Sequence, residues 1–77
     1  MNRTTSYRMR GDPDKIMLLM GKKGMSRTNV MKKSGLGNGT IHRVMCGTPV
    51  MPNTLGNFAF ALGVDVTEIM AEGDTSA

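Results

Sequence analysis

Aromatic residues, cysteine and histidine are scarce in this sequence. Its 77 residues include no Trp, one Tyr, two Phe, one Cys and one His. So few aromatic rings argue against a surface on which RNA bases stack. A single cysteine cannot form a disulfide within the chain, and Cys46 with His42 falls short of the three protein ligands that zinc sites usually have. We therefore expect no metal, no cofactor and no internal disulfide.

Long apolar runs are also missing. No stretch approaches the roughly 18 residues needed to cross a membrane, and the basic N-terminus is not followed by the apolar segment of a secretion signal. We expect no membrane partner and a reduced, cytoplasmic location on the nucleoid.

The length of the chain restricts it to one domain. Domains of this size bury only about 60% of the surface that the unfolded chain exposes, which argues against a large enclosed active site. His42 and Cys46 lie four residues apart, but this couple lacks a third group to orient it for nucleophilic catalysis. We expect that the protein is not an enzyme.

Positive charge is concentrated in the first part of the chain. Residues 1–43 hold all ten Lys and Arg against two Asp, a formal charge of +8, whereas residues 44–77 hold four acidic residues and no basic one, a charge of −4. This separation indicates a basic face that meets a polyanion and an acidic end turned away from it. A basic surface that faces only solvent is the competing interpretation.

The first predicted helix starts at Asp12-Pro13, where Asp can accept hydrogen bonds from the first helical N–H groups and Pro needs no partner for its nitrogen. It extends over residues 13–21 or 13–23 and ends at Gly24. Its inward stripe comprises Ile16, Leu19 and Met20.

The next two predicted helices are separated by a short glycine turn. Ser26 caps a helix over residues 27–33, which ends at Gly35, where a positive φ is expected. The following helix begins at residue 37 or 38 and ends at residue 45 or 46. Two helices joined by so short a turn are typical of a helix-turn-helix, which places its second helix in the DNA major groove.

Two more helices are predicted after residue 52. Asn53 is the expected cap of a helix that ends at Gly63, and Asp65 with Glu68 has the form of a capping box that opens a fifth helix. No alternating strand pattern occurs, so the predicted fold is an all-α compact five-helix bundle. We expect a flexible basic N-terminal arm over residues 1–11, the helix-turn-helix domain over 12–71 and an acidic C-terminal tail over 72–77.

Several short motifs recur in order along the chain: Gly35-Leu36, Thr40-Ile41, Arg43, Gly47, Thr54-Leu55 and the run from Phe58 to Val64. In combination they resemble the Cro/phage-repressor (lambda-repressor-like) helix-turn-helix DNA-binding domain over about residues 12–71. The resemblance implies a domain that binds double-stranded operator DNA, usually as a homodimer on a two-fold symmetric site. Two residues depart from the family: Met31 replaces a preferred Ala, and Gly39 replaces a polar side chain.

The candidate contacts divide into those that read bases and those that bind the DNA backbone. Helical spacing points Ile41, Val44 and Met45 inward on the recognition helix. The outward residues are Asn38, Gly39, His42 and Arg43; Asn can pair with adenine and Arg with guanine through two hydrogen bonds each. The candidate backbone contacts are Ser26, Arg27, Thr40 and Asn53, with the basic residues Lys32, Lys33, Arg8 and Arg10. Lys32 and Lys33 also suit the negative end of their helix.

The sequence therefore predicts a sequence-specific DNA-binding transcription regulator, a Cro-like repressor from a phage or mobile element that acts by occupying an operator. The alternative is a protein-interaction module such as an antitoxin or adaptor.

Overall fold

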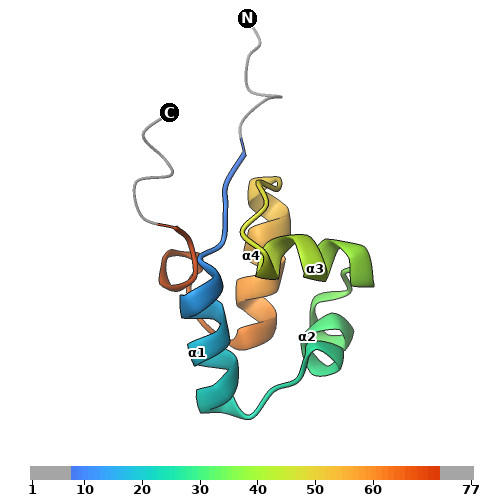
Figure 1. Cartoon of the computed structure of the whole chain (residues 1–77). Helices are drawn as coiled ribbons and strands as arrows, with labels where there is room; N and C mark the ends of the chain where they lie inside the picture. The colour runs from blue at the N-terminus through green and yellow to red at the C-terminus, as the bar shows by residue number, and fades with distance from the viewer. Residues whose placement is uncertain (1–7, 72–77) are drawn as a thin grey trace, which may run out of the picture.

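The computed structural model describes residues 8–71. Within them the predicted all-α class is confirmed, with four α-helices in contact around one core. Figure 1 shows α1 and α2 on either side of the domain, with α3 crossing α4. The elements are α1 (Pro13–Lys23), α2 (Arg27–Ser34), α3 (Asn38–Met45), α4 (Pro52–Leu62) and the short 3-10 helix η2 (Val66–Glu68).

Local capping chemistry fixes α1 and α2 as predicted. The Asp12 carboxylate accepts hydrogen bonds from the N–H groups of Asp14 and Lys15, at 2.9 and 3.3 Å. Gly24 and Gly35 end the two helices in the left-handed conformation, with φ of 63° and 75°. These helix boundaries therefore follow from residues close by in the sequence.

The predicted cap of α4 is wrong by two residues. Met51 occupies the N-cap position without a side-chain hydrogen bond, Pro52 is the first helical residue, and Asn53 lies in the first turn. Pro is well suited to that first position because its φ is already helical and it has no N–H to satisfy. Pro52 thus starts the helix before Asn53 can cap it.

The predicted fifth helix is also wrong, since only the 3-10 turn η2 forms there. The capping box is present: Asp65 accepts from the N–H of Thr67 at 3.0 Å, and Glu68 accepts from the N–H of Asp65 at 3.1 Å. Hydrogen bonds from the hydroxyl and the N–H of Thr67 hold the pKa of the Asp65 carboxyl below its usual range.

No longer helix follows η2 because the N-terminal segment forms hydrogen bonds with the backbone of residues 69–71, which a longer helix would need. The N–H of Asp12 donates to the carbonyl of Ile69 at 2.7 Å, and the N–H of Ala71 donates to the carbonyl of Arg10 at 2.9 Å. Gly11 and Met70 form an isolated antiparallel bridge between these two contacts.

The inner end of the predicted N-terminal arm is part of the domain. Met9 is buried, and its backbone N–H and carbonyl each form a 2.8 Å hydrogen bond with Val50 in the loop before α4. Residues 8–11 therefore do not form the flexible arm that was expected, because they pair with both Val50 and the segment after η2. The remaining arm, residues 1–7, and the predicted acidic tail, residues 72–77, lie outside the described residues.

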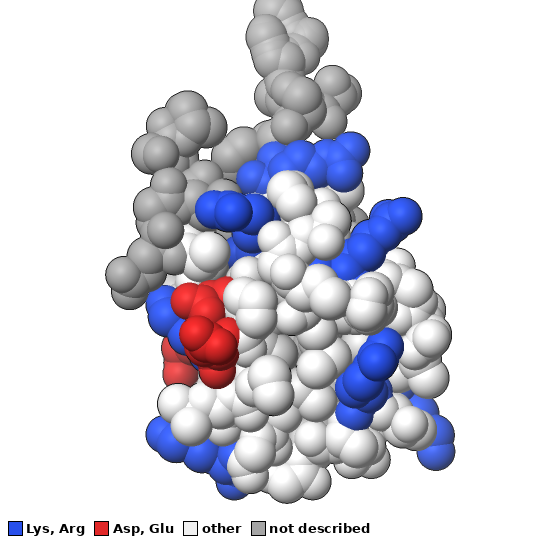
Figure 2. Space-filling view, viewed as in Figure 1, with Lys and Arg blue, Asp and Glu red and all other residues white. Residues whose placement is uncertain are grey.

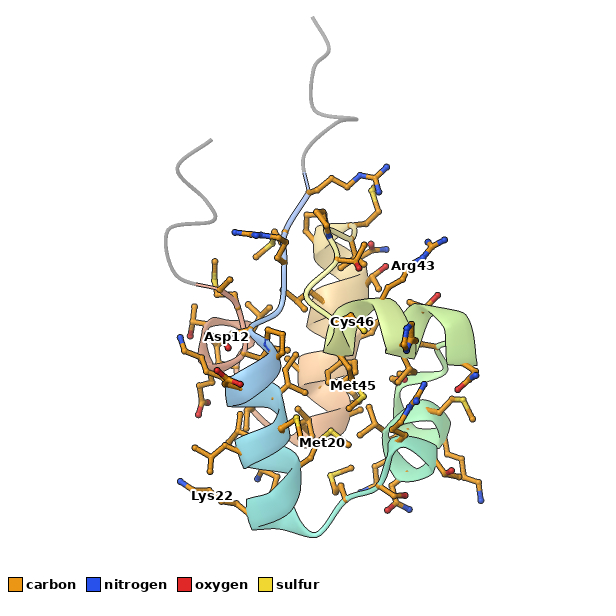
Figure 3. The ribbon with its side chains drawn as sticks, viewed as in Figure 1. Asp12, Met20, Lys22, Arg43, Met45 and Cys46 are labelled. Atoms are coloured by element: carbon orange, nitrogen blue, oxygen red, sulfur yellow. The ribbon has the colours of Figure 1, made fainter. Side chains whose placement is uncertain are left out.

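The core joins all four helices and the segment after η2. Met20 of α1 and Met45 of α3 fill the space between their helices (Figure 3). No helix within residues 8–71 is long and apolar enough to cross a membrane. The fully buried side chains are Ile16, Val30, Ile41, Val44, Leu55, Phe58, Leu62 and Ile69.

Gly11 provides a test of how closely the N-terminal segment packs on α3. A Cβ at Gly11 would lie 2.8 Å from Cδ1 of Ile16 and 3.2 Å from the carbonyl oxygen of Val44. We expect Gly11→Ala to lower the free energy of unfolding by about 1 to 3 kcal/mol in urea denaturation, because the Val44 backbone cannot move freely. Gly21→Ala is the control: its Cβ meets nothing within 4 Å, and α1 should gain up to about 1 kcal/mol. Equal effects of the two changes would contradict the packing.

Candidate nucleic-acid interface

The turn between α2 and α3 is fixed by local hydrogen bonds. The Ser34 hydroxyl accepts from the N–H of Leu36 at 3.1 Å, and Gly35 has the positive φ that was predicted. Leu36 is half-buried and packs against the core. The turn therefore holds α3 at a defined position relative to α2.

The outer side of α3 carries the four residues that were predicted to face DNA. Ile41 and Val44 are completely buried and anchor the helix. The exposed residues of α3 are Asn38, Gly39, His42 and Arg43. Arg43 points away from the body of the domain in Figure 3. At eight residues, α3 is about 12 Å long, close to the width of a major groove of about 12 Å.

Arg27 and Asn38 connect the starts of α2 and α3. Nη2 of Arg27 donates a hydrogen bond to Oδ1 of Asn38, and the two atoms are 3.3 Å apart. The amide oxygen of Asn38 keeps a second lone pair, and its NH₂ group keeps both hydrogens. Asn38 can therefore still present one acceptor and one donor to an adenine while Arg27 orients it.

His42 and Cys46 form a second pair on α3. The Cys46 sulfur lies 3.5 Å from Nε2 of His42, and both side chains are exposed. Among residues 8–71, no group of three His, Cys, Asp or Glu side chains gathers that could hold a metal ion. The geometry instead lets the thiol restrict the orientation of the imidazole on the exposed side of α3.

Ser26 has a structural partner that the sequence interpretation missed. Its hydroxyl accepts from the N–H of Asn29 at 3.2 Å, while Oδ1 of Asn29 accepts from the N–H of Ser26 at 2.9 Å. This capping box occupies the Ser26 side chain, which was a candidate backbone contact. The N–H groups of Arg27 and Thr28, which precede the first intrahelical hydrogen bond, remain available to a phosphate.

Three segments gather at the other end of the candidate interface. The Met9–Val50 pairing brings Arg8 beside the loop that connects α3 to α4, and the exposed Asn53 lies in the first turn of α4. Figure 2 shows basic side chains at the upper end of the molecule, where Figure 1 shows the described part of the N-terminal segment, from residue 8. In the same view the acidic side chains gather at the left, away from α3.

Several candidate residues are less favourably placed. Lys32 and Lys33 are exposed in the last turn of α2, at the opposite end of that helix from Arg27. Thr40 is half-buried within α3, and Arg10 is exposed while its backbone carbonyl bonds Ala71. The structure therefore brings Arg27 and Asn38 into contact and exposes Arg43 on the same helix as Asn38. The two lysines lie at the far end of α2 from this contact.

A model of the Cro/C1-type HTH DNA-binding domain matches residues 15–71. This chain belongs to the Cro/C1-type helix-turn-helix family. Membership implies DNA as its partner and confirms the resemblance seen in the sequence.

No curated protein matches the sequence of this Cro/C1-type domain. Among solved structures, a variant of hydroxyethylphosphonate dioxygenase is similar, with a TM-score of 0.72 and 23% sequence identity. The match covers 84% of this chain but only 14% of that enzyme's chain. It shows that the two share a fold over this segment.

Two contacts of the Cro/C1-type domain could not be found by sequence reasoning. The Arg27–Asn38 hydrogen bond joins residues on two different helices and depends on their crossing geometry. For the Met9–Val50 pairing, the sequence offers only one indication, an apolar Met between two arginines. Asn29 was missed because a capping box usually has Glu or Gln at that position.

Ser26→Ala tests whether the hydroxyl has a structural role. Losing the cap should lower the free energy of unfolding by about 1 kcal/mol, measured by urea denaturation. Thr28→Ala, at an exposed neighbouring position, should leave stability unchanged or raise it slightly. No loss of stability in Ser26→Ala would mean that the capping box contributes little and that the hydroxyl is free for DNA.

Proposed function

We propose that this Cro/C1-type domain is a sequence-specific, double-stranded DNA-binding transcription regulator, a Cro-like repressor of a phage or mobile element. The observation that carries the proposal is the exposed side of α3, where Asn38, His42 and Arg43 project from a helix anchored by buried side chains. Occupancy of an operator would block polymerase, so regulation would require no catalysed reaction. The protein would act in the cytoplasm, on the nucleoid.

Base discrimination would come mainly from two side chains. The Arg43 guanidinium can donate two hydrogen bonds to the major-groove edge of guanine, and the Asn38 amide can pair with adenine. Gly39 lies between them in the sequence without a side chain, so it adds no hydrogen bond to a base. We therefore expect the protein to specify only a few base pairs in each half-site of the operator.

Affinity would come largely from contacts to phosphates. Arg27 lies at the start of α2 beside free helix N–H groups, and Arg8 lies beside the loop before α4. Helix starts attract phosphates because their N–H groups and the helix dipole both favour negative charge. Binding through such contacts weakens strongly as salt rises, since each neutralised phosphate releases counterions.

We further propose that the regulator binds as a homodimer, at least on DNA. Two copies of α3 would then read two half-sites one helical turn apart, about 34 Å, on a palindromic operator. A selection of binding sites from random duplex DNA tests this mode directly. A palindromic consensus is expected, whereas a single asymmetric site would contradict the homodimer.

Arg43→Ala should relax the preference at one base position of the selected site. We expect a loss of about 1 to 3 kcal/mol in discrimination there, measured by binding to all four base pairs at that position. Arg8→Ala is the control, because an arginine beside the loop before α4 that contacts only phosphates should weaken binding to all four duplexes equally. If Arg43→Ala also weakened all four equally, its assignment as a base-reading residue would be wrong.

Arg27 and Asn38 should act as a unit in base recognition. We expect Arg27→Ala and Asn38→Ala to be non-additive in a double-mutant cycle, with a coupling of about 0.5 to 3 kcal/mol. The coupling should appear on the duplex with the selected base pair opposite Asn38 and vanish when that pair is changed. Additive effects on both duplexes would show that Arg27 binds phosphate independently.

The alternative, a protein-interaction module such as an antitoxin or adaptor, predicts a different response to salt. For the regulator, the logarithm of the binding constant should fall steeply with the logarithm of salt concentration, by about 0.9 for each phosphate neutralised. Absence of binding to duplex DNA at low salt would contradict the regulator.

A further inference from the structure

A surface cavity lies outside the candidate DNA interface, at the C-terminal ends of three helices. Its volume is about 590 Å³, and it is lined by Lys23, Met25, Lys33 and residues 60–63. None of these belongs to α3. In Figure 1 the C-terminal ends of α1 and α4 lie at the lower end of the domain, away from the N-terminal segment at the upper end. The cavity would therefore stay open while α3 occupies a groove.

The cavity combines an apolar floor with an exposed aromatic ring. Ala61 and Leu62 are buried at its base, whereas Phe60 is 78% exposed. A single exposed apolar residue is ordinary on a protein surface. Phe60, however, adjoins a hollow into which another large apolar side chain could insert, so both side chains would lose contact with water.

The rim of the cavity is basic. Lys23 and Lys33 line it, and among residues 8–71 no acidic residue does so. The last turns of α1 and α2 hold four lysines in all, and that of α4 holds no basic residue. A helix C-terminus carries about half a negative charge, so three such ends leave an excess of positive charge. Helix stabilisation alone does not account for all four lysines.

We propose that this cavity binds a segment of another protein that presents a large apolar side chain next to Asp or Glu residues. The apolar side chain would pack on Phe60 and Leu62, and the carboxylates would pair with Lys23 and Lys33. The positive charge of Lys23 and Lys33 favours an acidic segment as the occupant of the cavity. Residues 1–7 are basic and residues 72–77 include no large apolar side chain, so neither stretch offers this combination. A second copy docked by two-fold symmetry would place lysines against lysines.

The occupant could therefore join the domain while it is bound to DNA, which would give the regulator a second partner. Peptide binding here does not require that α3 bind an operator. A failure of this proposal would thus leave the proposed DNA binding unaffected, and the two can be tested separately.

The test uses the full chain, isotopically labelled, and two synthetic peptides followed by NMR. Both peptides are amphipathic, about twelve residues or three helical turns long, with Leu and Phe on one side; one has Glu on the other side and its match has Lys. The Glu peptide should shift the amide signals of Met25, Phe60 and Gly63. The Lys peptide should bind at least tenfold more weakly.

Matched variants show whether the cavity is responsible. Phe60→Ser and Lys23→Gln should each weaken the Glu peptide at least tenfold, while Met17→Ser, at another exposed apolar site of α1, should not. Phe60→Ser should retain its affinity for duplex DNA.

Four results would overturn the proposal. These are equal binding of both peptides, no shift with millimolar Glu peptide, shifts centred on α3, or a dimer in sedimentation that Phe60→Ser converts to monomer. The third result would mean that the acidic peptide imitates DNA, and the fourth that a second copy fills the cavity.

Discussion

The burial of Ile41 and Val44 is the interaction on which the candidate DNA interface depends. The recognition helix α3 has eight residues, begins without a side-chain cap and contains Gly39. An isolated helix shorter than about 12 residues is marginal in water, so α3 must gain its stability from packing. Both anchoring side chains are fully buried. Their burial fixes the rotation of the helix and therefore decides that Asn38 and Arg43 face outward.

A second constraint comes from the N-terminal segment, which connects parts of the domain that are distant in sequence. Residue 9 pairs with Val50 in the loop after α3, and residues 10–12 pair with residues 69–71. This segment supports the loop that leads into α4 and stops the chain after η2 from continuing as a helix. A stretch expected to be free is thus part of the framework that positions Arg8.

The parts of the fold that could be predicted depend on neighbouring residues. Asp12 and Ser26 cap helices, and Gly24 and Gly35 end them, through contacts within one turn of the chain. The outward side of α3 followed from helical spacing. The length of the last helix and the Arg27–Asn38 contact could not be predicted, because both depend on how distant segments meet. At the start of α4, Pro52 as a first helical residue and Asn53 as a cap predict different boundaries, and the helix begins at Pro52.

Whether the outer side of α3 meets DNA is tested most directly by locating the contact on the labelled protein. Amide signals would be followed by NMR during titration with a duplex of the selected site, about two helical turns long. We expect the largest shifts on Arg27, on residues 38–43 and on the first turn of α4. Shifts centred instead on the cavity around Phe60, with α3 unaffected, would contradict this expectation.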